Sequence, residues 1–532
     1  MRWRRYRNLS LNNRMPLKAN PFLRQTQDKR IAQDDHGRVE GILAGLDAGT
    51  VNGCGREGRF SIMDLLTRNA VLMKKKVAFY TAGCRLNQSE TAVLTDRFTR
   101  MGYEKVSYGE PTDLLVLNTC TVTENAEADC RRVIRRTLRH SPQAFVAVTG
   151  CYAQTGLNTL QHLPGVDLVL GNQYKMLLPD YLEEMPRVQK RASTFVRHSG
   201  SMSREDFVQD GVGEYATTRA NLKIQDGCNF MCSFCLIPFA RGRERSRLSD
   251  DAVREAEQLV ERGHRELVLT GVNIGRFANG AGGLLDLIRR LEAIPGLARI
   301  RISSIEPTTI PDALLEYMST SRKLCRFLHV PLQSGHDGIL SAMSRRYSVK
   351  EYRDWVERAV QTIPDVCVGT DVLVGFPGET DRQFSATCEL VRELPLAYAH
   401  VFSYSARPGT PAARLGNPVP HAEIKIRNQQ LSELSRIKRA RFYQQFLDRD
   451  CLALFESIGK DGLWTGLTDN FIRVGVACSG SLANQLRRVR LTGVMEHAAL
   501  GKLVDEDPPR PRRFPLPVFQ SFEKEAVGLP SA

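Results

Sequence analysis

Short apolar runs alternate with stretches of helical spacing along most of this chain. The first runs, at residues 77–81, 114–118 and 146–149, have the length of buried strands, and helical stretches separate them. Strands that alternate with helices are typical of a parallel sheet. The pattern therefore predicts an open, parallel α/β domain over residues 73–178.

A second alternation of strands and helices begins near Asn221, after a stretch of weak pattern at about 176–216 that is interpreted as a polar linker. Six strand–helix units predict an open, partial (β/α)6 barrel over residues 216–440. Its candidate strands are residues 221–225, 266–270, 299–303, 327–331, 371–374 and 399–403.

Both ends of the chain differ from this α/β pattern. A charged helix at about 421–448 precedes short β-like runs at 452–456, 471–476 and 489–494, which predict a small all-β module over residues 441–503. The proline-rich tail 504–532 is predicted to be disordered.

Residues 1–72 are rich in arginine and show little apolar periodicity. Three interpretations compete: a disordered basic arm, a targeting peptide, or upstream sequence read from a start codon placed too early. Met73, followed by three lysines and a clean strand, favours the third interpretation.

The bulk composition narrows the class of protein. No run of about 18 apolar residues and no signal-peptide core occur, so we expect no membrane span and a cytoplasmic location. A net charge of +15 suits a phosphate backbone, although an indifferent basic surface has the same charge. The 13 cysteines of a cytosolic chain are not expected to form a disulfide framework, so some of them are candidate metal ligands.

The densest cysteine motif is C-x-x-x-C-x-x-C, formed by Cys228, Cys232 and Cys235 just after the first predicted barrel strand. A 4Fe–4S cluster is fully ligated by four thiolates. Three thiolates can hold such a cluster but leave one of its irons without a protein ligand. S-adenosylmethionine (SAM) can chelate that iron and be cleaved to a 5′-deoxyadenosyl radical. A zinc knuckle and three cysteines together by chance are the alternatives; a zinc site needs a fourth ligand nearby, and none is evident.

Three further cysteines follow the first three predicted strands almost at once. Cys84, Cys120 and Cys151 each lie at the carboxyl end of such a strand. Ligands bind at this edge of open parallel sheets, so the three thiols are expected to converge on one point.

With these motifs the chain resembles the methylthiotransferase family of radical SAM enzymes from about Lys74 to Leu503. Within that family it resembles most closely the branch that acts on N6-threonylcarbamoyladenosine in tRNA. The segments that carry the resemblance are TAGCRLNQSE (81–90), NTCTVT (118–123), TGCYAQ (149–154), KIQDGC (223–228), TGVNIG (270–275), VPLQSG (330–335) and GFPGET (375–380).

The resemblance implies two 4Fe–4S clusters, with SAM and tRNA as further ligands. Cys228, Cys232 and Cys235, the radical triad, would hold the cluster that cleaves SAM. Cys84, Cys120 and Cys151, the auxiliary triad, would hold a second cluster that carries the sulfur to be delivered. The implied product is 2-methylthio-N6-threonylcarbamoyladenosine, next to the anticodon. An electron donor and a sulfur source, which the sequence does not identify, are also implied.

The remaining site assignments depend on the resemblance more heavily. The expected SAM contacts are Asn273, Gln333, Gly375 and Gly378, each of which alone would be an ordinary loop residue. The C-terminal module resembles a TRAM domain, an RNA-binding β-barrel, most clearly at TDNFIRV (468–474). No catalytic residue beyond the cluster ligands is predicted.

One arginine run and the remaining cysteines are expected to have ordinary structural roles. The basic run Arg241, Arg243, Arg245 and Arg247 is expected to be a solvated face, with phosphate contact as the alternative. The other cysteines are expected to be inert or ordinary core thiols: Cys54, Cys130, Cys325, Cys367, Cys388, Cys451 and Cys478.

Three alternative functions are weighed against the leading one. Two are related enzymes, which modify N6-isopentenyladenosine in tRNA or an aspartate of a ribosomal protein; the sequence around Cys84 favours the threonylcarbamoyl branch. The third is a non-catalytic iron–sulfur RNA-binding or sensor protein. Sets of only three cysteines argue against it, because a structural cluster is normally fully ligated.

Overall fold

The computed structural model describes residues 74–504, apart from 122–125, 185–187, 201–211, 214, 216 and 280–281. The predictions for residues 1–73 and 505–532, including those for Met73 and Cys54, lie outside the described residues. No helix in the described part of the chain is long and apolar enough to cross a membrane.

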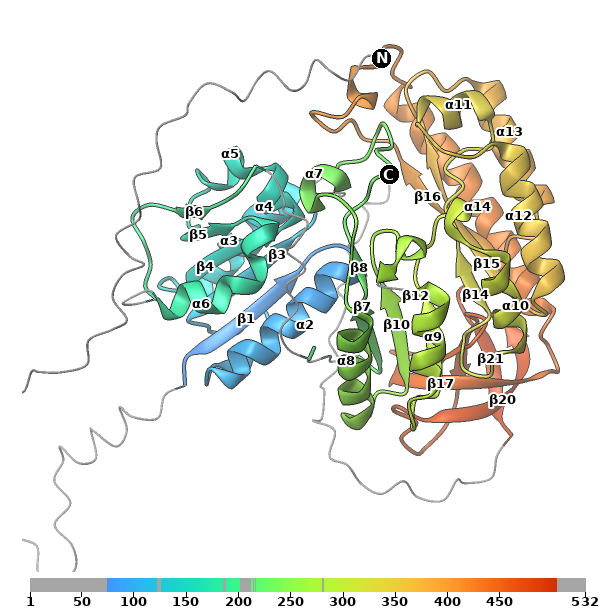
Figure 1. Cartoon of the computed structure of the whole chain (residues 1–532), viewed down its shortest axis with the longest axis horizontal. Coiled ribbons are helices and arrows are strands. Elements are labelled where there is room, and N and C mark those ends of the chain that lie inside the picture. Colours follow the sequence, from blue (N-terminus) through green and yellow to red (C-terminus); the bar gives the residue numbers. More distant parts are fainter. Residues whose placement is uncertain are drawn as a thin grey trace, which may run out of the picture. The chain divides into compact units, whose positions relative to one another are not determined.

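The first part of the described chain is a parallel six-stranded sheet in the order β2-β1-β3-β4-β5-β6 (Figure 1). Apolar cores lie on both of its faces, which explains why its central strands are almost continuously apolar. The three strands predicted from the sequence are confirmed. The strands are β1 (Lys76–Thr81), β2 (Glu104–Val106), β3 (Leu114–Thr119), β4 (Phe145–Gly150), β5 (Leu168–Leu170) and β6 (Phe195–Arg197). The helices are α2 (Arg85–Arg100), α3 (Ala126–His140), α4 (Cys151–Thr155), α5 (Leu157–Leu160), η3 (Asn172–Leu177) and α6 (Leu178–Glu183).

The polar stretch at 176–216 differs from its interpretation as a linker. It contains α6 and the edge strand β6, which pairs with β5 in parallel. Strand β6 has only three residues and exposes Phe195, so it lacks an apolar run like those that predicted β1, β3 and β4.

All six predicted barrel strands are present, in two parallel three-stranded sheets, β13-β10-β7 and β14-β15-β16. Single bridges between Ile300 and Leu324 and between Ser304 and His329 join the two sheets into one open series. The strands are β7 (Arg219–Lys223), β10 (Glu266–Thr270), β13 (Arg299–Ile302), β14 (Phe327–His329), β15 (Cys367–Val374) and β16 (Tyr398–Ser403). The larger helices are α8 (Ser249–Glu261), α9 (Leu284–Glu292), α10 (Asp312–Thr320), α12 (Val349–Thr362), α13 (Asp381–Glu393) and α14 (His421–Gln444), which share the main apolar core with the strands.

Short elements of this barrel region shape its loops. They are β8 (Gln225–Asp226), α7 (Ile237–Arg241), β9 (Arg245–Ser246), η4 (Ile274–Arg276), β11 (Ala278–Asn279), β12 (Gly282–Gly283), η5 (Pro307–Thr309), α11 (Asp337–Ala342) and η6 (Ala412–Arg414).

The C-terminal module is a closed five-stranded barrel in the order β17-β18-β19-β21-β20. It contacts the amino ends of the central strands: the buried Arg301 of β13 pairs with Glu266 and donates to the backbone oxygens of Thr468 and Asp469, both at 3.0 Å. The strands are β17 (Asp450–Ile458), β18 (Trp464–Thr468), β19 (Arg473–Val476), β20 (Leu486–Val494) and β21 (Ala499–Leu503). The loops at the carboxyl ends of the central strands are therefore left for the site.

Candidate functional site

The auxiliary triad lies at one edge of the N-terminal sheet. Cys84 caps the start of α2, Cys120 follows β3, and Cys151 is the first residue of α4 after β4. Cys120 and Cys151 are buried, whereas Cys84 is exposed. All three follow the carboxyl ends of neighbouring parallel strands, as predicted.

Two glycines let the three cysteine loops approach one another. Gly83, at φ +92°, lies so close to Cys120 that an added Cβ would be 2.6 Å from the Cys120 sulfur. A Cβ on Gly150, at φ +102°, would be 2.3 Å from the backbone oxygen of Thr119. Only glycine suits such positions. The loops before Cys84 and Cys151 are thus packed against the loop of Cys120, and the donor set fits an iron–sulfur cluster with one exposed side.

The radical triad occupies the loop between β8 and α7. Its sulfurs already accept hydrogen bonds, from the backbone N–H of Phe230 to Cys228 and of Ile237 to Cys235, both at 3.4 Å. Burial, together with the nearby charges of Cys232 and Cys228, raises the pKa of the Cys235 thiol to about 12. Thiols that raise one another's pKa lie close together, and a bound cation would reverse the effect, so this set also fits a metal cluster.

A buried arginine connects the radical triad to the barrel. Arg345 donates to the sulfur of Cys232 at 3.3 Å and pairs with Glu306, in the loop after β13. An arginine N–H aimed at a ligand sulfur stabilises its negative charge, which is how surrounding groups adjust the potential of a cluster.

Of the four expected SAM contacts, Asn273 best fits a ligand. It is buried, and its side-chain Nδ2 has no hydrogen-bond partner among the described residues. Its loop is tied to the radical triad by Gln225, whose oxygen accepts the Asn273 N–H at 2.9 Å while its amide donates to the oxygen of Gly227 at 2.8 Å. An unsatisfied buried amide beside this loop can donate a hydrogen bond to a ligand.

The other three expected contacts have clear structural roles. Gln333 has a φ of +68° and donates its N–H to the oxygen of Asp371 at 2.8 Å. Gly375 donates to Glu379, and a Cβ there would meet Ile424 of α14 at 2.4 Å. Gly378 donates to the oxygen of Asn417, with open space around its Cα. Packing against α14 thus accounts for Gly375, and contact of these residues with SAM stays a prediction.

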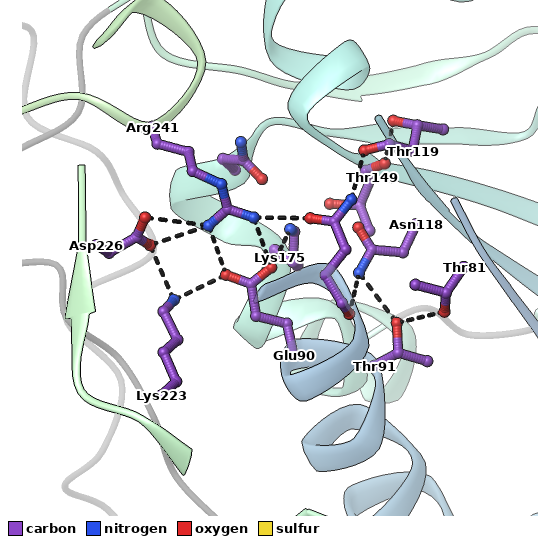
Figure 2. A network of polar contacts seen from close by, with 12 residues as sticks. Thr81, Glu90, Thr91, Asn118, Thr119, Thr149, Lys175, Lys223, Asp226 and Arg241 are labelled. Atoms are coloured by element: carbon purple, nitrogen blue, oxygen red, sulfur yellow. Dashed lines mark hydrogen bonds and ion pairs between the residues drawn. The ribbon is translucent and has the colours of Figure 1, made fainter. Parts of the chain in front are cut away.

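A buried network of charges joins the N-terminal sheet to the radical triad's loop (Figure 2). Glu90 of α2 pairs with Lys175 at 2.6 Å, with Lys223 at 2.7 Å and with Arg241 at 3.0 Å. Arg241 also pairs with Asp226, two residues before Cys228, and donates to the side-chain oxygen of Asn87 at 2.7 Å. The network therefore spans from the helix that begins beside Cys84 to both ends of the radical triad's loop.

The interpretation of the arginine run as a solvated face is wrong for three of its four members. Arg241, Arg245 and Arg247 are buried, and only Arg243 is exposed. Arg241 and Arg245 pair with Asp226, while Arg247 pairs with Asp251 and Glu255. An arginine at every second position suggests an exposed face when its acidic partners are not evident in the sequence. Here the acidic partners of the buried arginines lie outside the run.

The network has an excess of positive charge beside Cys151. Lys175, Lys223, Arg241 and Arg245 are paired with two carboxylates, Glu90 and Asp226. Burial would raise the pKa of Glu90, but the cations outweigh it and hold that pKa well below its usual range. A thiolate at Cys151 favours the charged forms of Lys175 and Arg241. The site thus suits an anionic group held by the auxiliary triad.

Two family models match the chain. Residues 76–171 match the uncharacterized protein family UPF0004, and residues 222–391 match the radical SAM superfamily. A relative from Bacillus subtilis (strain 168), the threonylcarbamoyladenosine tRNA methylthiotransferase MtaB, is 35% identical over 78% of this chain and 93% of its own length. The chain belongs to the methylthiotransferase family of radical SAM enzymes.

Other methylthiotransferases are similar over nearly their whole length. The protein of the same name from Aquifex aeolicus (strain VF5) is 38% identical over 75% of this chain and 96% of the relative. The tRNA-2-methylthio-N(6)-dimethylallyladenosine synthase of Cereibacter sphaeroides is 35% identical over 80% and 98%. The resemblance predicted from the cysteine motifs is thereby confirmed.

Sequence reasoning missed most of the residues that support the two triads. Glu90 and Asp226 lie inside segments chosen for their cysteines, and Lys175 lies in a stretch without a motif. Their burial was the missing information. A charged residue inside an otherwise apolar helix face, such as Glu90 among Val93 and Leu94, is a signal that would have pointed to one of them.

Proposed function

We propose that this methylthiotransferase transfers a methylthio group to carbon 2 of N6-threonylcarbamoyladenosine, next to the anticodon of tRNA. The names of the similar proteins from Bacillus and Aquifex support this substrate. The observation that carries the proposal is one buried charge network, in which Arg241 pairs with Glu90 on the helix that begins after Cys84 and with Asp226 just before Cys228.

The radical triad would hold one 4Fe–4S cluster with SAM, and the auxiliary triad would hold a second. Together these groups supply the radical that removes hydrogen from an unreactive C–H bond and the sulfur that replaces it. Asn273 would donate its unsatisfied amide to SAM, and Arg345 would donate to the sulfur of Cys232.

The residues around the triads position the reaction. Methylthio transfer needs the two sites held at a fixed separation while a nucleotide lies between them, because the radical must be quenched where it forms. Helix α7, directly after Cys235, packs against α4, which begins at Cys151. Arg241 at the end of α7 also ties this helix to α2, through Glu90 and Asn87.

The RNA partner is supported by the net charge of +15 and by the closed C-terminal barrel, whose architecture suits an RNA-binding module. N6-isopentenyladenosine in tRNA is the second candidate substrate, because the relative from Cereibacter sphaeroides bears the name of an enzyme for the dimethylallyl nucleoside.

The test is anaerobic reconstitution with iron and sulfide, followed by incubation with SAM, reductant and tRNA that carries either modified adenosine. Mass spectrometry of the digested nucleosides should show 2-methylthio-N6-threonylcarbamoyladenosine. Product only from isopentenyladenosine would reassign the substrate, and SAM cleavage without any methylthiolated nucleoside would contradict the function.

A further inference from the structure

Three polar side chains lie together on one face of the sheet β14-β15-β16, outside both triads. They are His329 at the end of β14, Asp371 in β15 and His400 in β16. Residues that alternate with them along β15 and β16, such as Val372 and Ala399, belong to the apolar core shared with the helices. The three side chains therefore lie on the opposite, inner face of the sheet.

Two links show that this face borders the proposed reaction site. The backbone oxygen of Asp371 accepts the N–H of Gln333, one of the expected SAM contacts, at 2.8 Å. The backbone N–H of Ile305, next to Glu306, donates to the oxygen of His329 at 3.0 Å. Glu306 pairs with Arg345, which donates to Cys232.

Within the group, hydrogen bonds fix the geometry. Nε2 of His329 lies 2.8 Å from Oδ1 of Asp371, and its Nδ1 lies 3.0 Å from the Tyr398 hydroxyl. Nδ1 of His400 lies 3.5 Å from the same Asp371 oxygen. Both nitrogens of His329 are therefore engaged by protein groups, which argues against the set as a metal site.

His400 differs from His329 in being accessible. Its side chain is 51% exposed, and that of Asp371 is 20% exposed. On the same face of β16, the ring of Phe402 is also exposed and lies edge-to-face against His400, with ring centroids 6.5 Å apart. Such a pair suits a nucleobase, which can stack on the accessible aromatic ring while the accessible imidazole forms a hydrogen bond with it.

We propose that His400, oriented by Asp371, reads the N6 substituent of the target adenosine while the base lies against Phe402. This inference rests on the proposed function and deepens it. A threonylcarbamoyl group offers N–H, hydroxyl and carboxylate groups, whereas an isopentenyl group is a hydrocarbon. With Nδ1–H directed at Asp371, the Nε2 atom of neutral His400 accepts a hydrogen bond, and the protonated ring donates one to a carboxylate. A site of this kind rejects an analogue that lacks the polar group.

The first measurement is binding, without reductant, of two anticodon stem-loop RNAs that differ only in carrying N6-threonylcarbamoyladenosine or unmodified adenosine. Wild-type protein should bind the modified loop roughly 10- to 100-fold more tightly, the range for one hydrogen bond to a charged group. His400→Leu should reduce this ratio to near one. His400→Gln, which keeps an amide that can donate and accept, should retain part of it. His162→Leu, at an exposed histidine of the N-terminal domain, is the matched control and should change nothing.

The second measurement separates this inference from the proposed function. His400→Leu should raise KM for the threonylcarbamoyl tRNA far more than it lowers kcat. An unchanged ratio of loop affinities in His400→Leu would overturn the role of His400 even if the wild type methylthiolates that tRNA. Absence of product from wild-type enzyme would instead overturn the proposed function.

Discussion

Replacing Glu90 by glutamine tests whether the buried network holds the two triads together. Glutamine keeps the shape of the side chain but removes the charge that faces Lys175, Lys223 and Arg241. The side chain of Glu90 is 7% exposed, and those of Lys175 and Arg241 are each 2% exposed. Removal of one partner of such a buried pair costs about 3–5 kcal/mol, because the remaining charges stay buried with less compensation.

The loss should be local rather than global, because the partners of this charge lie on η3, at the end of β7 and on α7. A cost of about 3 kcal/mol corresponds to roughly a 100-fold loss of hydrogen-exchange protection at the amides of α7 and η3. Glu104→Gln, at an exposed residue of β2, is the control. Glu90→Gln should still cleave SAM but should transfer the methylthio group much more slowly than the wild type.

The dependence on pH follows from the direction of the pKa shift. Because the pKa of Glu90 in the folded protein is lowered, its stabilising effect is complete above its unfolded value of about 4.3 and is lost as the pH falls toward the folded value. The difference between Glu90→Gln and wild type should therefore be equal at about pH 6 and about pH 8. Exchange protection at α7 within about threefold of wild type would refute the argument.

The remaining predictions concern the cofactors. Alanine at all three positions of the radical triad should reduce about eight irons per loaded chain to about four and abolish SAM cleavage, measured by iron analysis and 5′-deoxyadenosine; retention of every iron would contradict the assignment. Alanine at all three positions of the auxiliary triad should leave SAM cleavage in place and abolish methylthiolated tRNA, checked by nucleoside mass spectrometry; modified tRNA from this variant would require another sulfur carrier. Asn273→Ala should raise KM for SAM roughly tenfold with iron content unchanged, and an unchanged KM would remove Asn273 from the SAM site.

The fold was largely predictable because its strands and helices produce local patterns of apolar residues in the sequence. Each of the nine strands predicted for the sheet and barrel is present, since buried parallel strands are short apolar runs that a sequence displays directly. The strands β2, β5 and β6 were not predicted, because each has only three residues and so does not form a run of the length by which the other strands were found.

The supporting residues of the site were less predictable, because pairing between distant residues leaves no local trace. Arg241 and Glu90 are 151 positions apart, so the sequence shows an arginine run and a helix but not their contact. The proposed role of His400 likewise could not be predicted, because it depends on the proximity of Asp371 on the neighbouring strand. The cysteines were found because the C-x-x-x-C-x-x-C spacing and the positions just after predicted strands are local features of the sequence.

The interface between the C-terminal barrel and the central strands affects how RNA binding can be studied. Arg299 donates to the backbone oxygens of Leu467 and Leu452, and Phe471 stacks on Phe327 with ring centroids 4.2 Å apart. Deleting the module would strip these acceptors from buried guanidinium groups and expose the base of the barrel. A truncated enzyme that no longer modifies tRNA would thus report damage to its catalytic scaffold as much as loss of an RNA contact. Substitution of an exposed basic residue such as Arg488 on β20 leaves the contacts of Arg299 and Phe471 in place and would test the proposed RNA contact directly.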